Sequence, residues 1–591
     1  MNPRKQLLYL FLIGLFCVQA HAQANKIETT LSNGQSVERE IAGGEVHAYQ
    51  IALTAGQFAR FRLEQRALDS TLSLAAPDGK PLAELNLSDA GNPEYFTLEV
   101  AQPGNYRITV TGNGQPLLRG AYVLKVVVQP TATEQDRKYI AAQTLLVDAY
   151  QLFKQFPQTE PQALGKLEQA LAIWRELGMT YETALTLHIW GKGLINLNQN
   201  EKSIPLLEQA RTIYQTANNR YGEASMHNML ANAYYNTRDY PKAVELFNEA
   251  LRIYREVKER RWEGLILGSL GNTYSNFNQP EKAIEYYDQC LLIVREVKDR
   301  RFEAQTLRGL GALYVNRGQM DKALEKTEAS VKIFQELKDR SQEGSSLNNI
   351  GIIYSRLGQS DKAIAVFDQL LALFIELKDR VQEANTLIAL GMAYGGAGQT
   401  EKAINYFERG LVISRELKNR PLESITFSNL GLAYQFISEY EKALEKLEQA
   451  LQISQETKNR RAEADALSTR GTTLAALSRY EKAIDSHEQA LTIFREVKYR
   501  LGEGNTLENL GNVYKFLGRE DQAVEYYDQA LAIFHETKYR VGEGNILGSL
   551  VRNQRRSCVK RSSQRKWWDE TTDLCPILDK RRSANAAERT A

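Results

Sequence analysis

The middle of the chain repeats with a period of forty residues. Arginine recurs at every fortieth position from Arg220 to Arg540, alanine from Ala243 to Ala523, and glycine from Gly271 to Gly511. Self-similarity at a fixed period of this length is typical of a solenoid, in which each structural unit packs only against its neighbours. For a chain of 591 residues, the repeat therefore favours one long array over several separate globular domains.

Each unit has the pattern of two helices joined by a turn. In the unit that begins at Arg300, apolar and small residues recur at helical spacing on both sides of Gly318 and Gln319: Leu307, Leu310, Gly311 and Tyr314, then Ala323, Leu324, Val331 and Phe334. Asp299 is placed to cap the first helix, and Asp339, Asp379, Asn419 and Asn459 repeat that position. The glycine and alanine rows predict close contact between the two helices of each hairpin.

The segments "NLGNVYKFLGREDQAVEYYDQALAI" and "SLGNTYSNFNQPEKAIEYYDQCLLI" resemble the tetratricopeptide repeat. The forty-residue spacing, with its "KDR" linker, resembles the polarity adaptors built on Leu-Gly-Asn repeats. The match spans roughly 181–550, with a divergent first pair at 134–177. The resemblance implies a right-handed superhelix that binds peptides or protein segments in a concave groove lined by the first helix of each hairpin.

Residues 25–130 have the pattern of short strands with one buried face. Apolar residues alternate with polar ones in three runs, around Phe61, Ile108 and Leu124. Turn pairs such as Asn33-Gly34 and Asp78-Gly79 separate the runs. Regular short strands with such turns predict an antiparallel β-sandwich. His47 and Asp78 are interpreted as a strand residue and a turn residue and not as metal ligands, because no convergent ligand set accompanies them.

The pieces "IAGGEVHAYQIALTAGQFARFRLEQ", "LSLAAPDGKPLAEL" and "PGNYRITVTG" resemble the bacterial pre-peptidase C-terminal domain. The resemblance covers about a hundred residues and implies a non-catalytic accessory module of exported proteins. The predicted fold class is therefore mainly α: a tetratricopeptide-type α-solenoid of about ten helical hairpins with an N-terminal antiparallel β-sandwich domain.

The N-terminus has the pattern of an export signal. Arg4 and Lys5 precede the apolar run 7–18, and the small-residue sites Ala20-His21-Ala22 and Ala22-Gln23-Ala24 follow. We expect an exported protein, periplasmic or secreted, with no stable membrane span after cleavage; the alternative is an uncleaved anchor. The expected organisation is a signal peptide at 1–24, the β-sandwich at 25–130, the repeat superhelix at 131–550 and a basic, divergent tail at 551–591.

The tail breaks the repeat, since Val551 stands where glycine is expected, and Lys and Arg outnumber acidic residues. We interpret it as a disordered, divergent or frame-shifted end; the alternative is a basic aromatic stretch that binds anionic surfaces or nucleic acid. Proteins that resemble this arrangement often continue into a caspase-like CHAT protease domain. A truncated or frame-shifted cysteine protease that retains only its recognition half is therefore the alternative function, although the tail contains no His.

The resemblance places the candidate binding residues on three rows of the first helix of each hairpin. The early units are rich in asparagine, whose amide can hold an extended backbone, and the middle units present apolar residues that predict a partner site. The candidate peptide-binding residues are Asn228, Asn232, Asn236, Asn272, Asn276, Arg308, Asn316, Asn348, Ile352, Arg356, Ile388, Met392, Leu432 and Phe436. The alternative is that the asparagines only solvate helix ends and the apolar residues seal the superhelix.

Charge and composition argue against other functions. The formal net charge is only +2, which disfavours a dedicated nucleic-acid binder. After loss of Cys17 the remaining cysteines are odd in number, and no cysteine or histidine cluster has zinc spacing. Cys290 replaces alanine in its helix and is expected to be a buried small residue. We therefore expect a non-enzymatic protein with no catalytic residues, no metal and no cofactor, whose partners are proteins or peptides; oligomeric state is left open.

Overall fold

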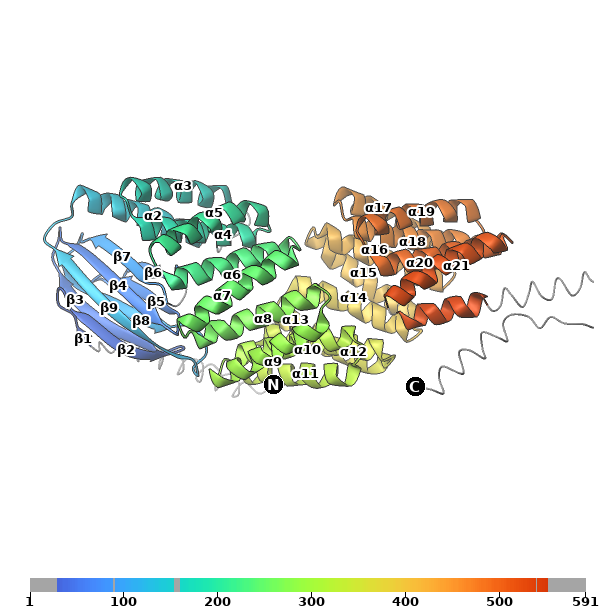
Figure 1. Cartoon of the computed structure of the whole chain (residues 1–591), viewed down its shortest axis with the longest axis horizontal. Helices are drawn as coiled ribbons and strands as arrows, with labels where there is room; N and C mark the ends of the chain where they lie inside the picture. The colour runs from blue at the N-terminus through green and yellow to red at the C-terminus, as the bar shows by residue number, and fades with distance from the viewer. Residues whose placement is uncertain (1–28, 89–90, 154–159, 538, 551–591) are drawn as a thin grey trace, which may run out of the picture. The chain divides into compact units, whose positions relative to one another are not determined.

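A computed structural model describes residues 29–88, 91–153, 160–537 and 539–550 (Figure 1). The expected signal peptide and the expected basic tail lie outside these residues, as do Cys17, Cys558 and Cys575. Within them, nine strands precede a long series of helices, so the predicted fold class, a helical solenoid behind an N-terminal antiparallel β region, is confirmed.

The strands form two sheets. Their order is β1-β3-β8-β5-β6 in one sheet and β2-β9-β4-β7 in the other, and all pairs are antiparallel except β1 with β3. The strands are β1 (Thr29–Thr30), β2 (Ser36–Ala42), β3 (Val46–Leu53), β4 (Phe58–Arg66), β5 (Ser70–Ala75), β6 (Pro81–Leu85), β7 (Glu94–Glu99), β8 (Gly104–Gly112) and β9 (Arg119–Gln129).

The period-two runs form the core between the sheets. Phe61, Ile108 and Leu124 are buried, as the alternation predicts. The Asn33-Gly34 and Asp78-Gly79 turns place their glycines at φ +81° and +84°, a conformation that side chains with a Cβ rarely adopt. His47 is buried against Tyr122, with Nδ1 at 2.7 Å from the tyrosine hydroxyl.

The helices pair into hairpins, and we call the first helix of each pair helix A and the second helix B. From α4 onward each labelled helix has seventeen residues. The helices are α2 (Glu134–Phe153), α3 (Glu160–Glu176), α4 (Thr180–Asn196), α5 (Asn200–Thr216), α6 (Arg220–Asn236), α7 (Tyr240–Glu256), α8 (Arg260–Asn276), α9 (Pro280–Glu296), α10 (Arg300–Asn316), α11 (Met320–Glu336), α12 (Arg340–Arg356), α13 (Ser360–Glu376), α14 (Arg380–Gly396), α15 (Thr400–Glu416), α16 (Arg420–Phe436), α17 (Tyr440–Glu456), α18 (Arg460–Ala476), α19 (Tyr480–Glu496), α20 (Arg500–Phe516) and α21 (Glu520–Glu536).

The chain divides into two compact units, and the division falls within α12, between Ile353 and Tyr354. The first unit contains the β-sandwich and helices α2 to α11; the second contains α13 to α21. Both units are built from the same hairpin.

The glycine row allows the two helices of a hairpin to touch. A Cβ added at Gly271 would lie 2.6 Å from the ring of Tyr287, and one at Gly391 would lie 2.5 Å from the ring of Phe407. Such distances are shorter than any van der Waals contact, so a larger residue at either position would force the ring to move. The predicted caps are also confirmed: Asp299, for example, accepts a hydrogen bond from the backbone N–H of Phe302.

An ion-pair triad recurs along the array. The arginine that begins helix A binds a glutamate three residues later and a second glutamate at the end of helix B of the same hairpin. In the hairpin of Arg300, Nη1 binds Glu303 and Nη2 lies 2.8 Å from Glu336. Hairpins that begin with Arg220, Arg260, Arg300, Arg380, Arg420, Arg460 and Arg500 share this arrangement.

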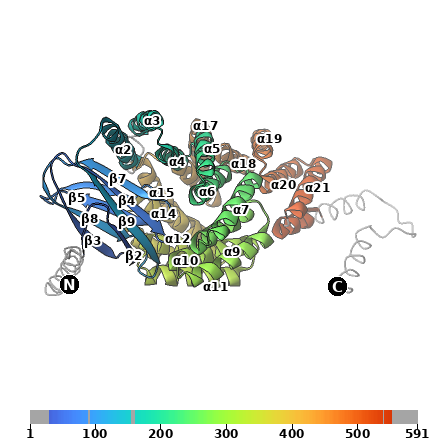
Figure 2. The same cartoon turned by 60° about the vertical axis from the view of Figure 1, so that its left-hand side comes forward.

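The β-sandwich packs against the first helices of its own unit (Figure 2). Helix α2 lies along β7, the edge strand of its sheet. The side-chain amide of Gln143 accepts from the backbone N–H of Thr97 and donates to the carbonyl of Tyr95. This amide therefore satisfies strand-edge groups that a further strand would otherwise pair with.

Candidate functional site

The candidate residues lie eight, twelve and sixteen positions after the first residue of helix A. We call this set of side chains the helix-A face. Spacings of four and eight residues place them on one side of a helix. Residues of the intervening packing rows, such as Leu270, Leu310 and Leu390, are buried.

In the first unit, the asparagines of this face bind one another and their own helices. Asn232 Nδ2 donates to the carbonyl of Asn228 at 2.9 Å. Asn236 Nδ2 donates to Asn200 Oδ1 at 3.0 Å, and Asn276 Nδ2 donates to the hydroxyl of Tyr235 at 2.8 Å. These amides link neighbouring hairpins, and Asn236 and Asn276 remain solvent-exposed.

Asn272 has an additional structural role. Its Oδ1 accepts a hydrogen bond of 2.6 Å from the hydroxyl of Tyr287, whose ring is buried beneath Gly271. In the second unit, Asn512 accepts from Tyr527 in the same way at 2.7 Å. The sequence could have predicted this asparagine–tyrosine pair, because both hairpins have a tyrosine fifteen positions after the asparagine.

Arg308, Asn316 and Asn348 complete the polar part of the face. Arg308 Nη1 donates to Gln342 Oε1 at 2.9 Å, and its guanidinium lies 5.9 Å from the centroid of the Phe334 ring. Burial of Arg308 lowers its pKa, although the nearby Asp339 opposes that effect. Asn316 is exposed and Asn348 is half-buried.

Large apolar side chains dominate part of the second unit. Met392 is 60% exposed, Leu432 is 42% exposed and Phe436 is 74% exposed. Arg356 is exposed as well. In the first unit, Ile352 is the corresponding exposed apolar residue of α12. Exposed apolar groups gathered on one set of positions mark binding surfaces more often than scattered ones do.

Ile388 is buried, with only 6% of its surface exposed, although an exposed side chain was expected. The expectation that it contributes to an exposed patch is wrong. The reason is Gly410 on the paired helix B: a Cβ there would lie 3.2 Å from Cγ1 of Ile388, so the isoleucine occupies the space that a larger residue would fill. In the hairpin of α8 and α9 the glycine is on helix A instead: Gly268 faces the larger Cys290 of helix B.

Sequence reasoning missed Ile425. It is exposed and lies seven positions before Leu432 and eleven before Phe436 on α16. Residues at these spacings share one side of a helix. Helix α16 therefore presents an apolar stripe over most of its length, and the signal was the i, i+7, i+11 spacing itself.

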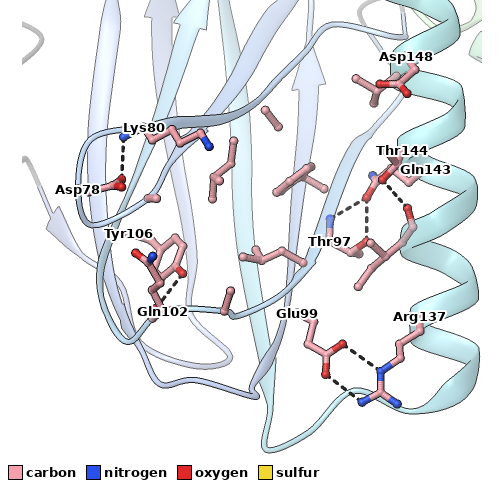
Figure 3. Close-up of a pocket in the computed structure, with 18 residues that line it drawn as sticks. Asp78, Lys80, Thr97, Glu99, Gln102, Tyr106, Arg137, Gln143, Thr144 and Asp148 are labelled. Atoms are coloured by element: carbon pink, nitrogen blue, oxygen red, sulfur yellow. Dashed lines mark hydrogen bonds and ion pairs between the residues drawn. The ribbon is translucent and has the colours of Figure 1, made fainter.

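A cavity of about 560 Å³ at the sandwich lies between β6, β7 and α2 (Figure 3). An ion pair between Glu99 and Arg137, 2.9 Å apart, closes one end. Lys166 holds Asp148 at 2.8 Å on another side. Apolar side chains that include Leu82, Phe96 and Leu98 form the rest of the lining.

The described residues contain no cluster of three or more His, Cys, Asp or Glu side chains that could hold a metal ion. Cys290 is fully buried beside Thr306 Oγ1 at 3.3 Å. Burial raises the pKa of its thiol to about 11, which keeps the unreactive thiol form at neutral pH. Within the described part of the chain, no helix is long and apolar enough to cross a membrane.

The tetratricopeptide repeat family model matches residues 222–296, 264–336, 302–376, 342–416, 382–456 and 462–536, together more than half of the chain. No curated protein matches the sequence.

Solved structures align with this chain at low sequence identity. The apo form of the quorum sensor NprR from B. thuringiensis is 15% identical, with 61% of this chain and 99% of that chain covered and a TM-score of 0.44. The STAND protein PH0952 from Pyrococcus horikoshii, which has a tetratricopeptide repeat sensor, is 16% identical, with 70% and 66% covered and a TM-score of 0.44.

Proposed function

The chain belongs to the tetratricopeptide repeat family, and from that premise we propose that it is a non-enzymatic scaffold that binds peptides or protein segments on its helix-A face. The observation that carries the proposal is the exposure of Met392, Leu432 and Phe436. Leaving large apolar side chains in water forgoes about 1.5–3 kcal/mol for each one that could be buried. A partner that covers them recovers that free energy.

The asparagine-rich face of the first unit supports the same function with a different chemistry. Amides such as Asn236 and Asn276 each keep hydrogen-bonding capacity beyond the bond that they make within the protein. An extended partner backbone offers alternating donors and acceptors. We infer that the asparagines of the first unit contact the backbone of a bound segment, and that the exposed apolar residues of the second unit, taken by themselves, anchor apolar side chains of a bound segment.

The test compares two exposed apolar sites on different helices of the second unit. Full-length protein is immobilised and exposed to a random peptide display library, and enriched peptides are measured by calorimetry. The double variant Met392→Ser/Leu432→Ser should bind them at least about tenfold more weakly, which corresponds to about 1.4 kcal/mol. Val412→Ser is the matched control, because Val412 is equally exposed but lies on helix B.

Equal binding by wild type and the double variant would remove the apolar helix-A face from the proposal. Loss of binding in Val412→Ser alone would transfer the function to helix B. Melting temperatures measured in parallel separate lost contacts from lost fold, and none of the three substitutions removes a buried group.

We further propose that the protein is exported to the periplasm or secreted. The support is the basic start at Arg4 and Lys5, the apolar run 7–18 and the small-residue sites before Asn25. Mass spectrometry of the protein from the exported fraction should find a mature N-terminus at Gln23 or Asn25. An intact Met1 in membrane-bound protein would favour the anchor instead.

A further inference from the structure

Strand β6 lies at the edge of its sheet, and its register determines which backbone groups it leaves unpaired. In the ladder between β5 and β8, the N–H of Asn113 donates to the carbonyl of Asp69 at 2.8 Å. Hydrogen-bonded pairs alternate along antiparallel strands, so the odd-numbered residues of β5 bond to β8 and the even-numbered ones bond to β6. The N–H and C=O groups of Leu82 and Glu84 therefore point away from β5. Both residues are exposed.

Strand β7, which lies at the edge of the other sheet beside β6, has its outward groups covered. The N–H of Val100 donates to the carbonyl of Gln57 at 2.8 Å, so the outward groups of β7 belong to Tyr95 and Thr97. Gln143 of α2 binds both of them. Helix α2 thus occupies the edge of β7, and no strand within the described ranges pairs with the free edge of β6.

The cavity of about 560 Å³ lies beside this free edge. Ala83, Phe96 and Val147 line it and pack against the sandwich core, yet each stays partly exposed. Lys80 lies on one side of the cavity and Thr144 of α2 on the opposite side (Figure 3). A strand added to β6 would lie about 4.8 Å from it and would direct every second side chain inward, on the side of Ala83. The cavity offers space and apolar contacts for such side chains.

We propose that β6 binds an extended peptide segment of a partner as an additional antiparallel strand, with the sequence pattern basic–apolar–polar–apolar. Backbone bonds to Leu82 and Glu84 would hold the segment, and pockets for alternate side chains would select it. This site lies on the β-sandwich and does not depend on the helix-A face.

The pattern follows from the positions opposite β6. The residue opposite Ala83, and the next inward one beside Pro81, point into the cavity and must be apolar to recover the free energy of burial. The residue opposite Glu84 points outward beside a carboxylate that has no ion-pair partner among the described residues. Opposite charges on directly opposed residues stabilise a strand pair and like charges destabilise it, so this residue is Lys or Arg.

The first test uses the peptide acetyl-Ser-Lys-Val-Thr-Val-Ser-amide, which places its lysine opposite Glu84, and a second peptide with glutamate in place of lysine. Each is titrated into full-length protein and followed by ligand-observed NMR. Wild type should bind the lysine peptide about twofold to fivefold more tightly. Glu84→Lys should reverse this preference. Glu40→Lys is the matched control, because Glu40 is an exposed residue of β2, at the far edge of the other sheet, and it should leave the preference unchanged.

The second test detects backbone pairing with the wild-type protein alone. In the proposed register the N–H groups of the peptide lysine and threonine point at β6, whereas the N–H of the first valine points away. N-methylation of the lysine or the threonine should abolish binding, and N-methylation of that valine should leave binding nearly unchanged.

Three results would overturn the inference: no saturable binding of the lysine peptide, equal loss of binding for all three N-methylated peptides, or an unreversed preference in Glu84→Lys. A preference lost in Glu40→Lys would place the peptide on β2 and overturn it as well. Light scattering after size exclusion provides the last check. Dimerisation of wild type that Glu84→Lys abolishes would assign the edge of β6 to a second copy of the chain instead of a partner peptide.

Discussion

The helix-A faces of the two units are built on the same packing but present different chemistry. In the first unit, Asn236 and Asn276 are tied by hydrogen bonds to the neighbouring hairpin. In the second, Met392 and Phe436 extend into solvent at corresponding positions. The packing of the repeat therefore fixes the positions of the side chains on the helix-A face. Their residue types can vary without changing the packing, which allows different units to bind different chemical groups.

The largest expected effect is a loss of stability when the close helix contact at Gly391, in the second unit, is disturbed. Gly391→Arg places a charge against the buried ring of Phe407 and should destabilise the second unit by about 3–5 kcal/mol. Gly391→Ala should cost less, about 1–3 kcal/mol, through overpacking. Urea unfolding followed by circular dichroism measures both.

Gly395→Ala is the matched control on the same helix, because an added Cβ would meet only Ala403 at 3.9 Å. It should be neutral or stabilise by about 0.5–1 kcal/mol, since alanine favours helix over glycine. If Gly391→Ala is as harmless as Gly395→Ala, the hairpin packing in the second unit is looser than the structure shows.

The second expected effect is a pH dependence at His487. Burial lowers the pKa of His487 to about 4, whereas an unfolded histidine has a pKa of about 6.5. The unfolded chain takes up the proton first as pH falls, so the contribution of His487 to stability is complete above pH 6.5 and decreases toward pH 4, by roughly 3 kcal/mol in total. His487→Phe should remove this dependence and raise stability at pH 7.

Unfolding free energies at pH 7, 5.5 and 4.5 for both proteins provide the measurement. The difference between wild type and His487→Phe should grow as pH decreases. A difference that is constant across this range would mean that His487 has found a partner or is accessible to water.

A smaller effect should show that the amide face is partly structural. Asn272→Ala leaves the buried hydroxyl of Tyr287 without its acceptor and should cost about 1–2 kcal/mol. In Tyr287→Phe/Asn272→Ala the cost should be lower than the sum of the two single variants, because no unsatisfied hydroxyl remains. Asn232→Ala, which loses only a bond to its own helix, is the control and should change stability little. If the costs of Tyr287→Phe and Asn272→Ala add up in the double variant, the Tyr287 hydroxyl is hydrogen-bonded to water in Asn272→Ala.

The smallest expected effect is the decrease in melting temperature when one glutamate of an arginine triad is replaced, and it should be equal in the two units. Glu296→Gln in the first unit and Glu536→Gln in the second each remove an exposed partner of an arginine triad. Arg260 and Arg500 lower the pKa of these carboxylates, so their contribution is present above pH 4.5 and is lost as pH falls further. Both variants should melt slightly lower than wild type at low salt and equally at high salt, where screening is strong. Unequal shifts would show that the units differ in more than their helix-A faces.

Sequence periodicity was sufficient to predict the hairpins, their caps and their packing rows, because these depend on residues that recur in register. The capping bond of Asp299 recurs at Asp379, Asn419 and Asn459, where the side chain is again Asp or Asn, and is absent at Glu259 and Tyr499. The close contact at Gly271 recurs at Gly391 and Gly511. The chemistry of the helix-A face was predictable only in part. Whether Ile388 is exposed depends on Gly410, a residue twenty-two positions away on the partner helix.

The hydrogen bonds of the helix-A asparagines were also not predictable from the sequence. Their exposure could be inferred from the helical pattern, but their bonds to Asn200 and Tyr235 depend on how consecutive hairpins stack. A row of amides therefore looks like free binding capacity in the sequence while part of that capacity is already used. Pairs such as Asn272 with Tyr287 are the recoverable exception, since the two residues belong to one hairpin.

The arginine triad has a consequence for how such a chain can grow. All three members of each triad belong to one forty-residue segment: Arg300, Glu303 and Glu336, for instance, are encoded together. A duplication of that length, starting at any codon, supplies a new hairpin with its own complete set of charge partners and its own cap. The array can thus lengthen by in-frame recombination without coordinated substitutions elsewhere, and new copies are then free to diverge at the few positions that face a partner.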